Sequence, residues 1–165
     1  ICDTRLKIAS YAKFDGNLKD ALTEYIFVNK EAAKYKHESI EAWSDIYLCE
    51  VYTNLSKFEE ALKHAKLGLA KMQKLNKNRG IGEASSNIGL IFDIIGKPDS
   101  ALFYYSISIT AAKKENNLPL LANTYSNIGV VNFYMGNYTN AIKNYELALE
   151  VNKNLITPNQ RQTTC

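Results

Sequence analysis

Residues 136–145 read Gly-Asn-Tyr-Thr-Asn-Ala-Ile-Lys-Asn-Tyr, and a similar pattern occurs at three earlier places in the chain. The alanine of the pattern recurs every 40 residues, as Ala21, Ala61, Ala101 and Ala141. A glycine or a serine stands five positions before each alanine, at Gly16, Ser56, Gly96 and Gly136. A fixed period of this size is typical of stacked repeat units and not of the core of a globular enzyme.

Each period contains two runs in which apolar residues recur at helical spacing. The first runs predict helices at 3–14, 39–55, 80–95 and 119–135, and the second runs predict helices at 18–36, 58–76, 98–116 and 138–155. Gly16, Gly96 and Gly136 supply the backbone freedom that tight turns between paired helices need. The polar, aperiodic residues 156–165 are expected to form a disordered tail.

The sequence therefore predicts an all-α fold, a right-handed superhelical solenoid of four antiparallel helix pairs. The array is expected to cover residues 1–155, with units at about 3–37, 39–77, 79–117 and 119–155. Small residues share one position of the first helices, and they let the paired helices approach closely: Ala9, Cys49, Gly89 and Gly129. A bulky residue at Ala101, on the partner helix of the third pair, is expected to cost about 1–3 kcal/mol.

The composition excludes several classes of function. The 165 residues carry a formal net charge of +3, and lysines are mixed with carboxylates, which is typical of a solvated surface without a basic stripe for nucleic acid. Cys2, Cys49 and Cys165 are odd in number and far apart, which indicates neither a disulfide framework nor a metal site. We expect no membrane span and no signal peptide.

No arrangement of residues predicts catalysis, and we expect no enzyme activity, no cofactor and no metal. His37 and His64 stand alone, without spaced metal ligands or a nucleophile motif, and both are expected on exposed helix surface. Gly80-Ile-Gly82 is similar to the start of a dinucleotide loop, but the third glycine is missing and no strand precedes it. A loop at the start of a helix is the preferred interpretation.

The repeated residues resemble the tetratricopeptide repeat. The fourth unit matches its pattern best, with Tyr125, Ile128, Gly129, Gly136, Tyr138, Ala141, Tyr145, Ala148 and Leu149. Ala12, Pro98 and Asn132 depart from the pattern, and the first unit matches least well. The period exceeds the family's usual length of about 34 residues, so longer helices or longer connections must take up the difference. Long-period arrays resemble the sensory segments of bacterial histidine kinases and transcription regulators, especially of the Bacteroidetes type.

The resemblance implies a concave groove lined by the first helix of each unit, in which an extended segment binds. By family position its candidates are Leu6, Ser10, Lys13, Trp43, Ile46, Tyr47, Glu50, Asn54, Glu83, Ser86, Asn87, Leu90, Asn123, Ser126, Asn127, Val130 and Tyr134. Asn87 and Asn127 lie one repeat apart, and an amide can both donate to and accept from a peptide backbone. The alternative is that these amides bond neighbouring helices and fix the stack.

Trp43 is either an exposed anchor for a partner or, as we favour, a residue packed between the first and second units. One subgroup of the family binds terminal carboxylates of chaperone tails through lysine and arginine beside such asparagines. The corresponding positions here hold Ser10, Trp43, Glu50 and Glu83, so this specificity is not expected.

The leading hypothesis is a non-catalytic module that binds a protein or an extended peptide, and not nucleic acid or a membrane. The alternative is a regulatory or sensory input domain of a larger bacterial signalling protein. Ile142, Tyr145 and Leu149 would lie uncovered on the last helix, whereas terminal units normally have a polar outer face. We therefore expect continuation of the chain or self-association. Free cysteines favour the cytoplasm, and the sensory-kinase resemblance leaves the periplasm open.

Overall fold

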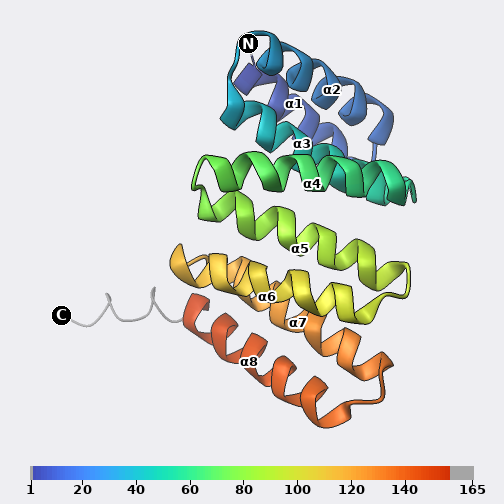
Figure 1. The fold of residues 1–165 in the computed structure, drawn as a ribbon, viewed down its shortest axis with the longest axis vertical. Coiled ribbons are helices and arrows are strands. Elements are labelled where there is room, and N and C mark those ends of the chain that lie inside the picture. Colours follow the sequence, from blue (N-terminus) through green and yellow to red (C-terminus); the bar gives the residue numbers. More distant parts are fainter. Residues whose placement is uncertain (1, 157–165) are drawn as a thin grey trace, which may run out of the picture.

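The computed structural model describes residues 2–156, and within them the chain forms eight α-helices and no strand (Figure 1). The helices are α1 Cys2–Phe14, α2 Leu18–Lys34, α3 Glu38–Asn54, α4 Phe58–Lys74, α5 Asn78–Ile94, α6 Pro98–Lys114, α7 Leu118–Tyr134 and α8 Tyr138–Ile156. The predicted all-α solenoid of antiparallel helix pairs is confirmed, and no predicted helix boundary is wrong by more than two residues. Residues 157–165, where we expected a disordered tail, lie outside the described residues.

One spacing governs the whole array. Each of the helices α2 to α7 has 17 residues, and three residues connect each helix to the next. Two helices with their connections therefore take the 40 residues of the sequence period. The excess over the usual repeat of about 34 residues lies in the helices and not in long loops.

Each connection ends the preceding helix with one residue in the left-handed region. Gly16, Gly96 and Gly136 take this conformation with φ between 72° and 79°, as the turn prediction required. In the first connection, the N–H of Asn17 donates to the carbonyl of Ala12 at 2.8 Å, which satisfies a free carbonyl at the end of α1. The same pattern of backbone bonds recurs at the later connections.

The core lies between the two helices of each pair and between successive pairs. The four alanines of the repeated phrase are at most 2% exposed. Cys49 is buried, as predicted. A Cβ added at Gly89 would lie 2.7 Å from the ring of Tyr105, so only glycine permits the present approach of α5 and α6.

The stacking of the pairs gives the array its curvature. The first helices α1, α3, α5 and α7 contact one another in succession, whereas the second helices have no contacts with one another in the described chain. Instead, α3 packs on α2, α5 on α4 and α7 on α6. Closer packing along the first helices places them on the inner side of the curve, and these helices carry the candidate residues of the groove.

Candidate partner-binding groove

The groove residues form rows because each unit repeats the same helix position. Tyr47, Asn87 and Asn127 make one row along α3, α5 and α7, and all three are half-buried. A parallel row is Glu50, Leu90 and Val130, of which Leu90 is 37% exposed. Of the other candidates, Glu83 and Ser126 are half-buried, whereas Asn123 and Tyr134 are exposed. The first helices thus offer side chains that are anchored at one end and accessible at the other.

A hollow of about 180 Å³ crosses three first helices in the first half of the groove. Its walls are Lys13 from α1, Glu50, Thr53 and Asn54 from α3, and Asn87 and Leu90 from α5. The ammonium group of Lys13 forms an ion pair with the carboxylate of Glu50. This cation was expected near the groove, but its pairing with Glu50 was not.

The two central asparagines differ in their hydrogen bonds. Asn87 donates from Nδ2 to Oε1 of Glu50 at 3.4 Å, at the long limit for a hydrogen bond. Asn127 has no side-chain hydrogen bond within the described part of the chain. The alternative interpretation, that these amides bond neighbouring helices and fix the stack, is therefore supported by one weak bond at Asn87 and by none at Asn127.

An aromatic stack lies beside the hollow. The ring of Tyr47 stacks between Tyr25, at 5.3 Å between centroids, and Trp43, at 5.8 Å. The guanidinium carbon of Arg79 lies 5.8 Å from the Trp43 ring centroid, within the range of a cation–π contact. Trp43 is half-buried and packs against the core shared by the second and third units. Our placement of Trp43 between the first and second units was therefore wrong.

The electrostatics of the groove change along its length. Burial, reinforced by the charge of Glu50, raises the pKa of Glu83, and Arg79 partly opposes this shift. Burial also raises the pKa of Tyr47. In contrast, α7 contains no lysine, arginine, aspartate or glutamate. The half of the groove on α1, α3 and the start of α5 is therefore ionic, and the half on α7 is uncharged.

Two candidates of the predicted groove are buried in the structure. Ile46 is fully buried because its side chain fills the space over Gly68 of α4, where an added Cβ would lie 2.9 Å away. Ser86 is 9% exposed. Neither of them can contact a partner without rearrangement, so their inclusion in the groove was wrong.

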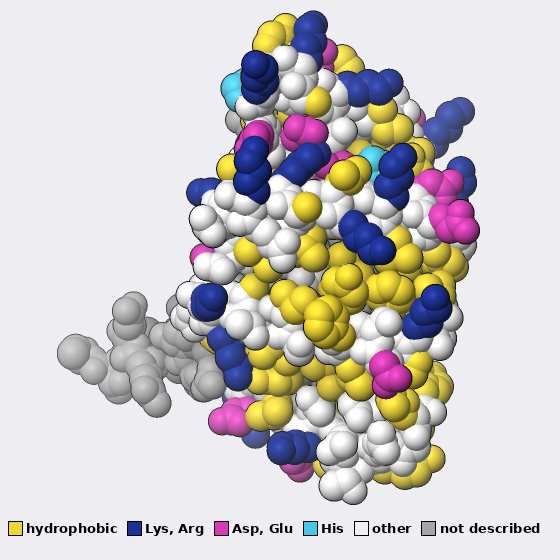
Figure 2. Space-filling model, viewed as in Figure 1, with side chains coloured by type: hydrophobic (Ala, Val, Ile, Leu, Met, Phe, Trp, Pro, Cys, Tyr) yellow, Lys and Arg dark blue, Asp and Glu magenta, His cyan; other side chains and the backbone are white. Residues whose placement is uncertain are grey.

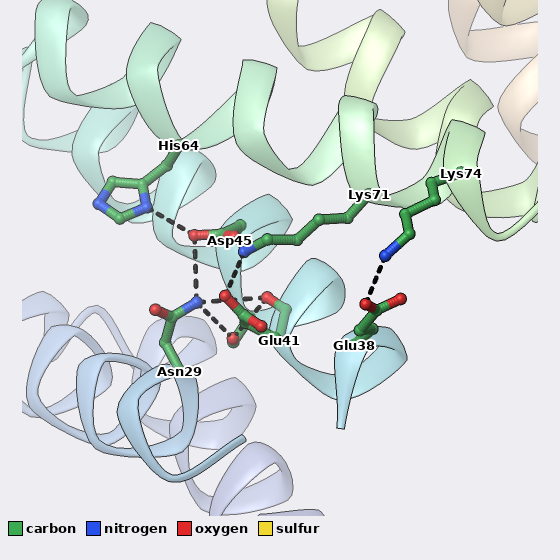
Figure 3. Close-up of polar contacts among 8 residues, drawn as sticks. Asn29, Glu38, Glu41, Asp45, His64, Lys71 and Lys74 are labelled. Carbon is green, nitrogen blue, oxygen red and sulfur yellow. Dashed lines mark hydrogen bonds and ion pairs between the residues drawn. The ribbon is translucent and has the colours of Figure 1, made fainter. Parts of the chain in front are cut away.

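The expectation of an exposed His64 was also wrong, because its side chain is 22% exposed and belongs to a partly buried polar network (Figure 3). At its centre is Asp45, whose side chain is 2% exposed. Oδ1 of Asp45 lies 2.9 Å from His64 Nδ1 and accepts from Asn29 Nδ2 at 3.1 Å, while Oδ2 accepts from Lys71 Nζ at 2.5 Å. His37, by contrast, is exposed just before α3.

The network ties the first two units together, because its members come from α2, α3 and α4 (Figure 3). Burial lowers the pKa of Lys71, but hydrogen bonds to Asp45 and Glu41 outweigh it and raise the pKa above its usual value. Sequence reasoning missed this cluster. The available signal was a charged residue at a position where the third and fourth units have Ser85 and Tyr125.

Beyond the groove, the face drawn in Figure 2 has lysine and arginine side chains scattered among carboxylates, with apolar side chains gathered at the level of α5 and α6. None of the helices within residues 2–156 is long and apolar enough to cross a bilayer. Those residues also contain no group of three or more histidine, cysteine, aspartate or glutamate side chains that could hold a metal ion.

Comparison with known proteins places the fold. Residues 122–155 match the tetratricopeptide repeat family. No curated protein sequence matches the chain. Among solved structures, BtubC (BKLC) from P. vanneervenii is similar with a TM-score of 0.81 and 18% identity, over 94% of this chain and 65% of that one.

Two further structures are informative. The TPR domain of Arabidopsis FLU is similar with a TM-score of 0.65 and 21% identity, over 72% of this chain and 98% of that one. The Rap conjugation gene regulator of the plasmid pLS20, solved in complex with the Phr* peptide, is similar with a TM-score of 0.76 and 17% identity. The match covers 88% of this chain but 41% of the regulator.

Proposed function

Because residues 122–155 are a tetratricopeptide repeat and the whole chain has the fold of such arrays, we propose that the chain is a non-catalytic module that binds an extended protein segment in the groove of its first helices. The observation that carries the proposal is the row of half-buried Tyr47, Asn87 and Asn127, one residue per unit. Regular spacing of this kind suits a ligand whose backbone repeats at regular intervals.

The charge distribution supports a partner with two unlike halves. Lys13, Glu50, Arg79 and Glu83 border the first half of the groove, and their formal charges cancel. An extended segment with ionic side chains toward α1 and uncharged side chains toward α7 would match both halves. The mixed surface charge favours a protein partner over nucleic acid, which needs a basic stripe.

Asn127 offers the sharpest test because its side chain makes no hydrogen bond within the described residues. Loss of a side-chain bond inside the array therefore cannot explain an effect of Asn127→Ala on binding. We would select binders from a library of random linear peptides displayed on phage and measure the best by isothermal titration. Loss of one neutral hydrogen bond costs about 1 kcal/mol, or roughly a fivefold weaker affinity.

The matched control is Thr110→Ala, which removes an exposed side chain of α6 on the outer side of the array. Asn127→Ala and Asn87→Ala should each weaken the selected peptide, and the double variant more so, while the control should bind as the parent does. Equal affinity of all four proteins would contradict a role of the asparagines. Selected peptides whose affinity is changed by no substitution along the groove would contradict binding in the groove itself.

A second candidate is a regulatory input domain, favoured by the similarity to a Rap conjugation gene regulator solved with a peptide. The chain spans less than half of that regulator, so in this reading the array would sense a peptide for another domain. The test is limited proteolysis of the complete natural polypeptide with and without the selected peptide. A cleavage pattern that the peptide changes only inside the array would contradict a regulatory role.

A further inference from the structure

The side of α8 that faces away from the rest of the stack carries three apolar side chains that the described chain leaves exposed. Ile142, Tyr145 and Leu149, here called the α8 face, are 57%, 36% and 60% exposed. In the earlier units the same positions lie under the first helix of the next unit. Tyr25 and Tyr105, the equivalents of Tyr145 in the first and third units, are fully buried.

The side of α1 that faces away from the rest of the stack carries residues at the positions through which α3, α5 and α7 pack on the preceding unit. Thr4, Ile8 and Tyr11, here called the α1 face, include side chains that are 51% exposed at Ile8 and 72% at Tyr11. Of the six residues at the positions of Ile8 and Tyr11 in α3, α5 and α7, five are at most 1% exposed: Leu48, Val51, Ile88, Ile91 and Val131. The α1 face borders a hollow of about 420 Å³ lined by Thr4, Arg5, Ile8 and Glu24.

We propose that the α1 face of a second copy of this chain packs on the α8 face, and so repeats between molecules the contact that joins units within one molecule. The argument is continuity with an interface that the chain already uses three times, where α3 packs on α2, α5 on α4 and α7 on α6. Both faces carry exposed apolar side chains at the positions that this interface buries within the molecule.

A ring contact of the first internal interface has a counterpart of different chemistry at the proposed joint. Tyr47 stacks on Tyr25 across the first internal interface, with 5.3 Å between ring centroids. The equivalents at the proposed joint are Lys7 on α1 and Tyr145 on α8. Lys7 is exposed, so in this register its flexible side chain can bring the ammonium group to the Tyr145 ring in a cation–π contact.

The joint is head-to-tail and not symmetric. Within the described residues, a first helix packs on the second helix of the preceding unit, and second helices do not touch one another. A symmetric pair of α8 faces would need the second kind of contact. A pair joined head-to-tail keeps one free α1 face on one molecule and one free α8 face on the other, so association continues as an open chain of molecules.

Two charge substitutions test the proposal by complementation. Ile8→Glu blocks the α1 face and Leu149→Glu blocks the α8 face, and both side chains are more than half exposed, so each glutamate is solvated in the folded monomer. The mass is measured by sedimentation equilibrium from micromolar to millimolar concentration, with circular dichroism as the check on folding. The parent should exceed a dimer as concentration rises, and each variant alone should stay near the monomer mass of 18.6 kDa.

An equal mixture of Ile8→Glu and Leu149→Glu should form a dimer of twice 18.6 kDa and nothing larger, because one intact face remains on each protein. Phe103→Glu is the matched control, since Phe103 is 60% exposed like Leu149 but lies on α6. The control should associate as the parent does. A monomeric parent, a mixture that stays monomeric, or a variant that still forms dimers alone would each overturn the proposal.

Discussion

The close approach of helices within a pair predicts opposite outcomes for two glycines at the same repeat position. An added Cβ at Gly89 would meet the ring of Tyr105 at 2.7 Å, and at Gly129 it would meet the ring of Tyr145 at 2.5 Å. Distance alone would make Gly129→Ala the worse change. The surroundings reverse this order, because Tyr105 is fully buried while Tyr145 is 36% exposed at the edge of the array.

The change in the free energy of unfolding caused by each substitution follows from two opposing contributions. Alanine in a helix interior is more favourable than glycine by about 1 kcal/mol, and this gain applies at both positions. Overpacking a closed core costs about 1–3 kcal/mol, and this applies in full only at Gly89, where the Tyr105 ring has no free side. We expect Gly89→Ala to destabilise by about 1–2 kcal/mol, and Gly129→Ala to be neutral or to stabilise by up to about 1 kcal/mol.

Urea denaturation followed by far-UV circular dichroism measures both effects, at low micromolar concentration so that association does not contribute. Hydrogen exchange of α5 and α7 amides would locate the loss, because repeat arrays can unfold in parts. Gly136→Ala is the control for backbone strain, since no atom lies within 4 Å of its added Cβ but its φ is +77°. Equal stability of the Gly89 and Gly129 variants would refute the reasoning.

Three further predictions concern charge and the thiols. Asp45→Ala removes the buried carboxylate at the centre of the network and all three of its contacts, and should cost about 3 kcal/mol, although Lys71 keeps its ion pair with Glu41. Glu38→Ala, which removes an exposed ion pair, should cost under about 1 kcal/mol in the same denaturation experiment. Burial and a neighbouring carboxylate raise the pKa of Glu83, so its ionisation opposes folding above the unfolded pKa. Glu83→Gln should therefore raise the melting temperature at neutral pH and have no such effect below about pH 4, where both states are protonated. Burial raises the pKa of Cys49 to about 12, so a thiol reagent should modify half-exposed Cys2 in the native protein and Cys49 only after unfolding, as mass spectrometry of digests would resolve.

The architecture could be predicted from sequence because every unit repeats the same small residue at the point of closest helix approach. The alanines of the repeated phrase and the turn glycines locate each pair, so the helix boundaries needed no tertiary information. Helical periodicity also placed Tyr47, Asn87 and Asn127 on the first helices.

Which side chains of a first helix face the groove could be predicted only in part. Ile46 and Tyr47 are neighbours, about 100° apart around α3, and the tilt between α3 and α4 decides which of them is covered. Gly68 leaves the space that Ile46 fills, and this contact joins residues 22 positions apart, which no local pattern reports. The partners of Asp45 escaped prediction for the same reason, since His64 and Lys71 come from the next helix.

The uniform alternation of 17-residue helices with three-residue connections restricts how such a chain can change in length. A single residue inserted inside a helix turns everything beyond it by about 100°, which moves the buried stripe of that helix away from both neighbours. Insertion or deletion of a whole 40-residue segment preserves every contact angle and shifts only the number of sites in the groove. This architecture therefore tolerates duplication of a whole unit, whereas small insertions are confined to the connections.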